Sequence, residues 1–181
     1  MSDSYVYRAK RRLAVQIAKR LGESQLRGNS DNAGPQIERF LRLFRSEFNR
    51  NEGTSKYSDL NEGFGWCGCF IYYCFQHSGF RFDPKPSGKL RTNLALGSMW
   101  KAWALLEENG FYVSSEDLPE VGDIVVLSKS ISDIECDHLG IVVDEGEDHL
   151  TMAEGDVQNS TGIFSRSVSP NANCYVRLTK Y

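Results

Sequence analysis

The apolar positions in the first part of the chain recur at helical spacing. Residues 5–22 carry apolar side chains at intervals of four and seven positions with basic residues between them, which predicts an amphipathic helix. Its basic face is expected to be solvated, with an anionic docking surface as the alternative. Pro35 suits the first position of a second helix over 35–48, whose apolar residues share one face.

A third helix is predicted to begin at Cys67, after a long loop rich in turn-forming residues. Gly79 would close it, because glycine readily adopts the left-handed backbone angles of a helix C-terminus. A fourth helix is predicted over 92–109, with Thr92 as its N-cap and Gly110 just past its end.

The pattern then changes to short β-branched segments separated by Gly, Asp, Asn and Pro, which predicts a mostly antiparallel sheet. The segments cover residues 122–128, 138–144, 149–155, 162–168 and 174–180. Helices followed by strands predict an α+β fold. The length of 181 residues suits one domain over 1–181, with 1–29 as an N-terminal helical extension and 30–181 as the core.

Composition narrows the classes of partner. The net charge of −3 gives no basic excess, so no nucleic-acid partner is expected. The first 22 residues lack an apolar signal-peptide core, and no apolar run reaches the length of a membrane span, so neither Sec export nor membrane insertion is expected. Five cysteines without an export signal favour reduced thiols over a disulfide framework.

Three of the cysteines fall in the segment GWCGCFIYYCFQHSGF, residues 65–80. On a helix, Cys67 and Cys69 point to different sides, whereas Cys67 and Cys74 share a face but lie about 10 Å apart along the axis. A disulfide within the segment is therefore excluded. Zinc would need a second ligand pair to match Cys74 and His77, so no metal and no other cofactor is expected.

The remaining hypothesis is a nucleophile at the start of the helix. The unpaired N–H groups and the positive end of the helix dipole favour the thiolate of Cys67. Cys69 and Cys74 lie inside the helix, where a packing role is expected. A lone cysteine would not suffice, so the hypothesis depends on a base.

Histidine supplies three candidates for that base. His77 would lie about 15 Å from Cys67 along the same helix, which is too far. A hairpin with its turn around Gly146 sets His138 directly opposite Glu154, close enough for the carboxylate to orient the imidazole. His149 falls near the turn on the other face and is a poor candidate.

The same register places an apolar set beside His138, and we expect this set to pack against a helix; it comprises Gly140, Val142, Leu150 and Met152. The residues thus predict a Cys67 nucleophile, a His138 base and a Glu154 orienting group, the parts of an acyl-transfer site. The backbone N–H of Cys67 would be one oxyanion donor, and Tyr57 is a guess for the second.

These motifs resemble the CHAP amidase and endopeptidase domains of the papain-like NlpC/P60 group. Trp66 to Phe70 is similar to the family's W-C-[AG]-x-F nucleophile motif, and GDIVVL at 122–127 to its next landmark. The segment DHLGIVV matches the family's histidine motif at His138, and EGD at 154–156 matches the third polar position. Asp156 stands where such enzymes often carry asparagine, so its role is open. The resemblance runs from about residue 30 to about residue 160.

The resemblance implies a papain-like fold and a hydrolase of peptidoglycan that cuts the N-acetylmuramoyl–L-alanine amide or a peptide bond. It marks Trp66 and Asp156 as accessory residues beside the triad. Because the wall lies outside the membrane, the resemblance implies action after phage-type lysis or specialised delivery, with delivery machinery or an inhibitory immunity protein as partners. Two alternatives stay open: a cysteine hydrolase or acyltransferase acting on another protein or lipid, and an inactive binding module.

Overall fold

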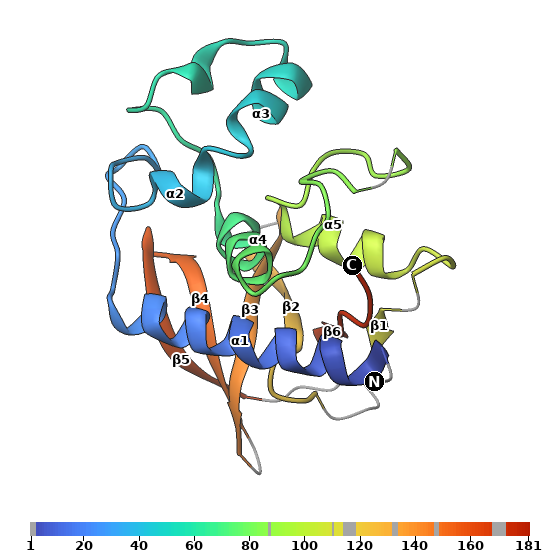
Figure 1. Ribbon diagram of the computed structural model, residues 1–181. Coiled ribbons are helices and arrows are strands. Elements are labelled where there is room, and N and C mark those ends of the chain that lie inside the picture. Colours follow the sequence, from blue (N-terminus) through green and yellow to red (C-terminus); the bar gives the residue numbers. More distant parts are fainter. Residues whose placement is uncertain are drawn as a thin grey trace.

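The computed structural model describes residues 3–86, 88–109, 111–113, 119–131, 134–146, 149–167 and 173–181 (Figure 1). Helices occupy the first part of this chain and strands the second. The helices are α1 (Asp3–Glu23), α2 (Glu38–Leu41), α3 (Arg45–Glu52), the 3-10 helix η1 (Lys56–Ser58), α4 (Cys67–His77) and α5 (Gly97–Ala104). None of the helices in the described part combines the length and apolarity that a bilayer crossing requires.

The first and third predicted helices are present as α1 and α4, and the second is divided into α2 and α3. Arg45 accounts for the break, because its guanidinium is bound at the junction. Its Nε donates to Glu38 at 2.9 Å, and Nη1 donates to the carbonyl oxygens of Tyr57 at 2.9 Å and Glu62 at 2.7 Å. One buried side chain therefore ties both short helices to the loop that leads to α4.

The fourth helix begins later than predicted, at Gly97 instead of after Thr92. The Asn93 side chain accepts a hydrogen bond from the N–H of Ala95 at 3.0 Å, and the N–H of Leu94 binds the Pro84 carbonyl at 2.8 Å. These bonds fold residues 93–95 into a turn, which competes with helix formation in the way that Asn side chains often do.

One antiparallel sheet follows, in the order β1-β6-β2-β3-β4-β5. Its strands are β1 (Tyr112–Val113), β2 (Ile124–Ile131), β3 (Ile134–Glu145), β4 (His149–Val157), β5 (Ser160–Ser167) and β6 (Asn173–Val176). Five of them match the predicted segments, and β1 was not predicted because two residues are too short for a pattern. The α+β prediction is confirmed.

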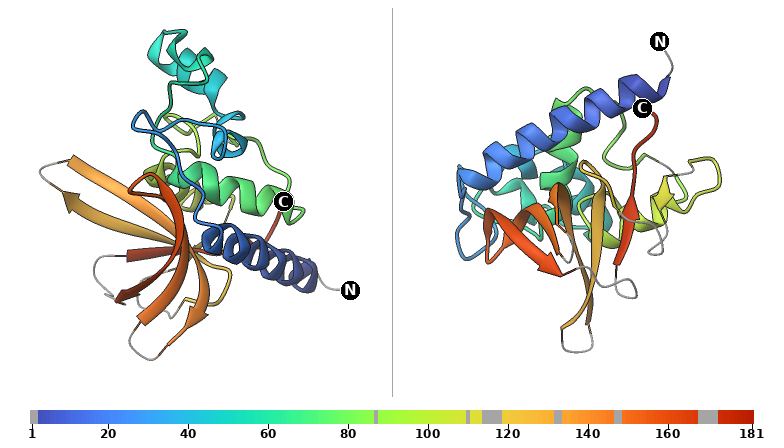
Figure 2. Two further views of the ribbon diagram at one scale, coloured as in Figure 1. Left: turned by 90° about the vertical axis from the view of Figure 1, so that its left-hand side faces the viewer. Right: turned by 90° about the horizontal axis from the view of Figure 1, so that it is seen from below.

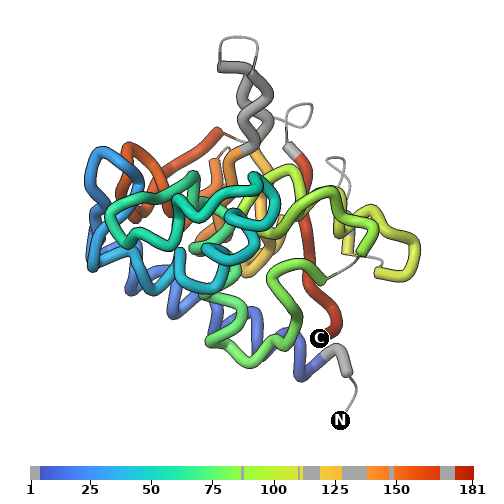
Figure 3. The backbone as a smooth tube through the Cα atoms, turned by 90° about the horizontal axis from the view of Figure 1, so that it is seen from above, coloured from blue at the N-terminus to red at the C-terminus, as the bar shows by residue number. Residues whose placement is uncertain are grey.

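The helices cover one face of the sheet, as the side view in Figure 2 shows. Helix α4 packs on β3 and β4, and α1 packs on α4 and on strands β3 to β5. Seen from above, the segment with α2 and α3 covers α4 (Figure 3), and Phe40 of α2 packs on α4. The large buried side chains between these layers include Trp66, Phe70, Phe75, Trp100, Trp103 and Phe111.

The β3–β4 register differs from the prediction by two residues. Gly140, not His138, lies opposite Glu154, and the strands slip again at an irregularity between Val142 and Asp144. A shift of two residues keeps the side chains of residues 140–142 on their predicted faces. Next to the turn, where Glu145 pairs with Leu150, the shift is three residues and the faces are reversed.

The prediction that the sheet face with Val142, Leu150 and Met152 packs against a helix was wrong. Val142, Leu150 and Met152 form a separate small cluster with residues of β2 and β6. The helices pack instead on the alternate positions, among them Leu139, Ile141 and Ala153.

Candidate active site

Cys67 is the first residue of α4, as predicted, and its side chain is partly exposed. The other two cysteines of the helix, Cys69 and Cys74, are fully buried. Burial raises the pKa of both thiols well above the usual value, so neither becomes a thiolate near neutral pH. This placement agrees with their expected packing role and leaves Cys67 as the accessible thiol of α4.

Two glycines allow the segments around Cys67 to approach closely. A Cβ on Gly68 would lie 2.2 Å from the Leu94 carbonyl oxygen, so the turn before α5 rests directly on the start of α4. A Cβ on Gly155 would lie 2.5 Å from the Cβ of Phe70 and 2.8 Å from the Trp66 ring. Strand β4 can therefore pack against α4 only because this position has no side chain.

His138 and Glu154 form the predicted pair. The Nε2 of His138 lies 2.8 Å from Oε2 of Glu154. Because Gly140 is the directly opposed residue, the imidazole reaches the carboxylate diagonally across the strand pair. The Glu154 side chain is 0% exposed, and that of His138 is 15% exposed.

This hydrogen bond assigns roles to the two imidazole nitrogens. An ionised carboxylate can only accept hydrogen bonds, so neutral His138 carries its proton on Nε2. The lone pair is then on Nδ1, which is the nitrogen able to accept a proton from a nucleophile. The carboxylate also stabilises the imidazolium that results.

Arg166 is a third residue that binds to the His138–Glu154 pair, and it was not predicted from the sequence. Its Nε donates to Oε1 of Glu154 at 2.8 Å, and its Nη2 donates to Oε2 at 2.6 Å. Burial raises the pKa of Glu154, but the hydrogen bonds from Arg166 and His138 outweigh it and bring that pKa below its usual value. Glu154 is therefore held as a carboxylate. Side chains alternate along β5, so Arg166 shares one face with Gly162 and Phe164, and this alternation is the pattern in the sequence that could have indicated its role.

Asp156 connects this pair to the start of α4. Its φ of 66° places it in the left-handed region, and its Oδ2 accepts a hydrogen bond from the backbone N–H of Trp66 at 2.8 Å. Burial raises the pKa of Asp156 to about 6, against the Trp66 bond and the charge of His138, which both lower it. One carboxylate therefore contacts the residue before Cys67 and lies within electrostatic range of His138.

Asn159 holds the same tryptophan from the β4–β5 turn. Its Oδ1 accepts a hydrogen bond from the Trp66 indole N–H at 3.1 Å, and the indole stacks on Phe40. Gln158 and Asn159 both have positive φ, as the two central residues of a tight hairpin turn require. The sequence did not indicate this turn, because its usual signal is glycine. Trp66 is thus fixed by both of its N–H groups.

The other singled-out residues lie in different surroundings. The Tyr57 hydroxyl donates to Glu52 at 2.9 Å, and its ring packs on Phe48. The role of Tyr57 as an oxyanion donor stays a prediction. His77 is exposed and stacks on a tyrosine one turn earlier, and His149 is exposed at the start of β4. Among the described side chains, no group of three or more His, Cys, Asp or Glu residues could hold a metal ion.

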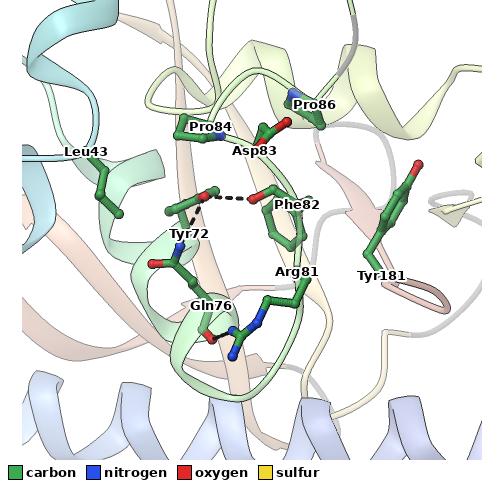
Figure 4. Close-up of a pocket in the computed structure, with 9 residues that line it drawn as sticks. All are labelled: Leu43, Tyr72, Gln76, Arg81, Phe82, Asp83, Pro84, Pro86 and Tyr181. Carbon is green, nitrogen blue, oxygen red and sulfur yellow. Dashed lines mark hydrogen bonds between the residues drawn. The ribbon is translucent and has the colours of Figure 1, made fainter.

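A pocket of about 500 Å³ lies toward the other end of α4 (Figure 4). Tyr72 and Gln76 of α4 form one wall, and the loop after α4 and Tyr181 form the others. Neither Cys67 nor His138 lines it. The site described above is therefore separate from this cavity.

The structure thus has a partly exposed thiol at the start of α4 and a hydrogen-bonded histidine–carboxylate pair on the sheet, the residue types that cysteine-dependent acyl-transfer sites use. The family model described as the CHAP domain matches residues 59–156, more than half of the chain. The chain therefore belongs to the CHAP domain family. CHAP domains are typically hydrolases, and membership suggests in general an amidase or endopeptidase of peptidoglycan.

A solved structure titled "The crystal structure of Ly7917" is similar to the chain with a TM-score of 0.42 and 16% sequence identity. The match covers 96% of this chain and 62% of that chain, so this chain spans less than two thirds of that protein's length. Membership of the CHAP domain family follows from the family model. No curated protein matches the chain significantly.

Proposed function

We propose that the protein is a cysteine hydrolase that cleaves an amide bond of peptidoglycan with Cys67, His138 and Glu154. The observation that carries this proposal is the connection of two elements through Asp156. That residue binds the backbone N–H next to Cys67, and it lies within range of the charge of His138, which is bound to Glu154. These contacts support the proposal that Cys67, His138 and Glu154 act together near the start of α4 as nucleophile, base and orienting carboxylate.

In the proposed reaction, Nδ1 of His138 takes the proton of the Cys67 thiol, and the sulfur attacks the carbonyl carbon of the scissile amide. The tetrahedral oxyanion would be stabilised by the backbone N–H of Cys67 at the helix start. The imidazolium then gives its proton to the leaving nitrogen as the C–N bond breaks, leaving an acyl group on the sulfur. Water, deprotonated by His138, hydrolyses this thioester and restores the thiol. The chemistry is papain-like.

The substrate rests on family membership and not on the site, since any amide of suitable shape could be attacked in this way. We infer either the N-acetylmuramoyl–L-alanine amide or a peptide bond of the stem or cross-bridge. Action on the wall would follow lysis or delivery by a dedicated machinery, and an inhibitory partner would protect the producing cell.

Purified sacculi incubated with the wild type, Cys67→Ala, His138→Ala and the control Cys69→Ser test the proposal. We expect the wild type and the control to release fragments, and both alanine variants to release none while remaining folded. Mass spectrometry of the fragments then identifies the bond. Equal release by wild type and Cys67→Ala would refute the nucleophile. No release by any protein, with activity on a protein or lipid acyl substrate, would favour the alternative hydrolase.

A further inference from the structure

Glu154 lies between two glycines on the neighbouring strands. Gly140 of β3 and Gly162 of β5 are its directly opposed residues. A Cβ on Gly140 would lie 2.9 Å from Cγ of Glu154, and a Cβ on Gly162 would lie 2.5 Å from the Phe164 ring. Because neither opposed position carries a side chain, longer side chains farther along both strands can reach the carboxylate.

His138 uses the space on the β3 side, and Arg166 uses the space on the β5 side. Arg166 lies opposite Leu150, four residues along β4 from Glu154. Its guanidinium carbon lies 5.1 Å from the Phe164 ring centroid, so the side chain runs over that ring toward Glu154. The two hydrogen bonds to Glu154 then occupy both carboxylate oxygens.

We propose that Arg166 is a positioning residue for His138, which it controls through Glu154. The bidentate contact fixes the plane of the carboxylate, and this plane determines where the imidazole is held. The positive charge of Arg166 also offsets part of the charge that Glu154 presents to His138. Loss of Arg166 would therefore strengthen the interaction between Glu154 and a protonated His138.

The charges around His138 make this second effect measurable. Glu154 and Asp156 are carboxylates that interact with His138, and Arg166 is a cation bound to Glu154. Without Arg166, the charge of Glu154 would act on the imidazole without the cation that offsets it. At the effective dielectric constant of a partly buried site, one lost charge would move the titration midpoint of His138 upward by about one pH unit.

NMR titration of the His138 imidazole in a Cys67→Ala background tests the proposal without any substrate. We expect Arg166→Gln to raise the midpoint by about one pH unit and Arg166→Lys, which keeps the charge, to raise it by less than half as much. Arg50→Gln is the control, since it removes an exposed arginine of a surface pair, and it should leave the midpoint unchanged. An unchanged midpoint in folded Arg166→Gln would overturn the proposal.

Arg166→Lys also provides a test if Arg166→Gln fails to fold. A lysine cannot make the bidentate contact, so the carboxylate should reorient and the nitrogen chemical shifts should show a mixture of the two imidazole tautomers. A single Nε2–H tautomer in Arg166→Lys, as in the wild type, would count against positioning.

The kinetic consequence rests on the proposed function. In sacculus hydrolysis we expect Arg166→Lys to lower kcat by about tenfold with little change in KM, because the substrate contacts remain. If the titration and tautomer effects appear but no variant or wild type hydrolyses sacculi, the inference about Arg166 stands and the proposed function fails. If sacculi are hydrolysed but His138 titrates alike in all proteins, the proposed function stands and the inference about Arg166 fails.

Discussion

Replacing Asp156 by Asn should make the protein less sensitive to pH. Asn keeps a side-chain oxygen that can accept the hydrogen bond from the Trp66 N–H, and it removes only the ionisation. Burial raises the pKa of Asp156 from 3.8 to about 6. A group whose pKa is higher in the folded state contributes stability at low pH, and this contribution is lost as pH rises through the folded-state value.

The magnitude follows from the two pKa values. From pH 5 to pH 7.5, a shift from 3.8 to about 6 makes the wild type lose at most about 1.4 kcal/mol of unfolding free energy through this group. The side chain is not completely buried, so solvent screening reduces this to about 1 kcal/mol. Asp156→Asn should escape that loss and gain about this amount relative to the wild type as pH rises.

Urea denaturation of both proteins at the two pH values measures the effect. Asp144→Asn is the matched control, because it removes an exposed carboxylate from the adjacent strand β3. The control should follow the wild type within about 0.3 kcal/mol. If the difference between the wild type and Asp156→Asn were the same at both pH values, Asp156 would not be buried as described and the reasoning would fail.

Three other substitutions have defined outcomes. Glu154→Gln should lower kcat/KM by roughly tenfold to a hundredfold and the free energy of unfolding by about 3 kcal/mol. The reason is that an amide cannot accept all three hydrogen bonds from Arg166 and His138. Sacculus assays measure the first effect, and urea denaturation measures the second. Gly155→Ala should cost about 1–3 kcal/mol in the same denaturation assay, since its Cβ would lie 2.5 Å from that of Phe70, and unchanged stability would contradict the packing. Cys74→Ser should also lose stability, because a hydroxyl would replace a buried thiol, yet keep the turnover of the wild type.

The sequence predicted that His138 and Glu154 share a face of the sheet, although the predicted register was wrong. Next to the turn the pairing is shifted by three residues, and the irregularity between Val142 and Asp144 reduces this shift to two, which returns the two side chains to one face. The period-two pattern carries no sign of this irregularity. His138 and Glu154 lie on one face of the sheet, and the imidazole contacts the carboxylate diagonally across Gly140.

Arg166 and Asn159 were not predicted, for different reasons. Arg166 reaches Glu154 on the adjacent strand across the β4–β5 turn, which the sequence did not indicate. Asn159 meets Trp66, 93 positions away in the chain, only after β4 has packed on α4. The start of α4 was easier, since Gly79 and the apolar run after Cys67 mark that helix locally. The division of the second helix depends on a buried arginine, Arg45, whose partners lie beyond it in the chain.

The proposed mechanism requires that Cys67 is the reactive thiol and that His138 is its base. The pH dependence of alkylation by iodoacetamide, followed by peptide mass spectrometry in the wild type and in His138→Ala, tests it most directly. We expect modification of Cys67 well before the buried Cys69 and Cys74, with a rate at pH 6 that falls at least tenfold in His138→Ala. Equal rates at Cys67 in the two proteins, or earlier modification of Cys69, would contradict the account.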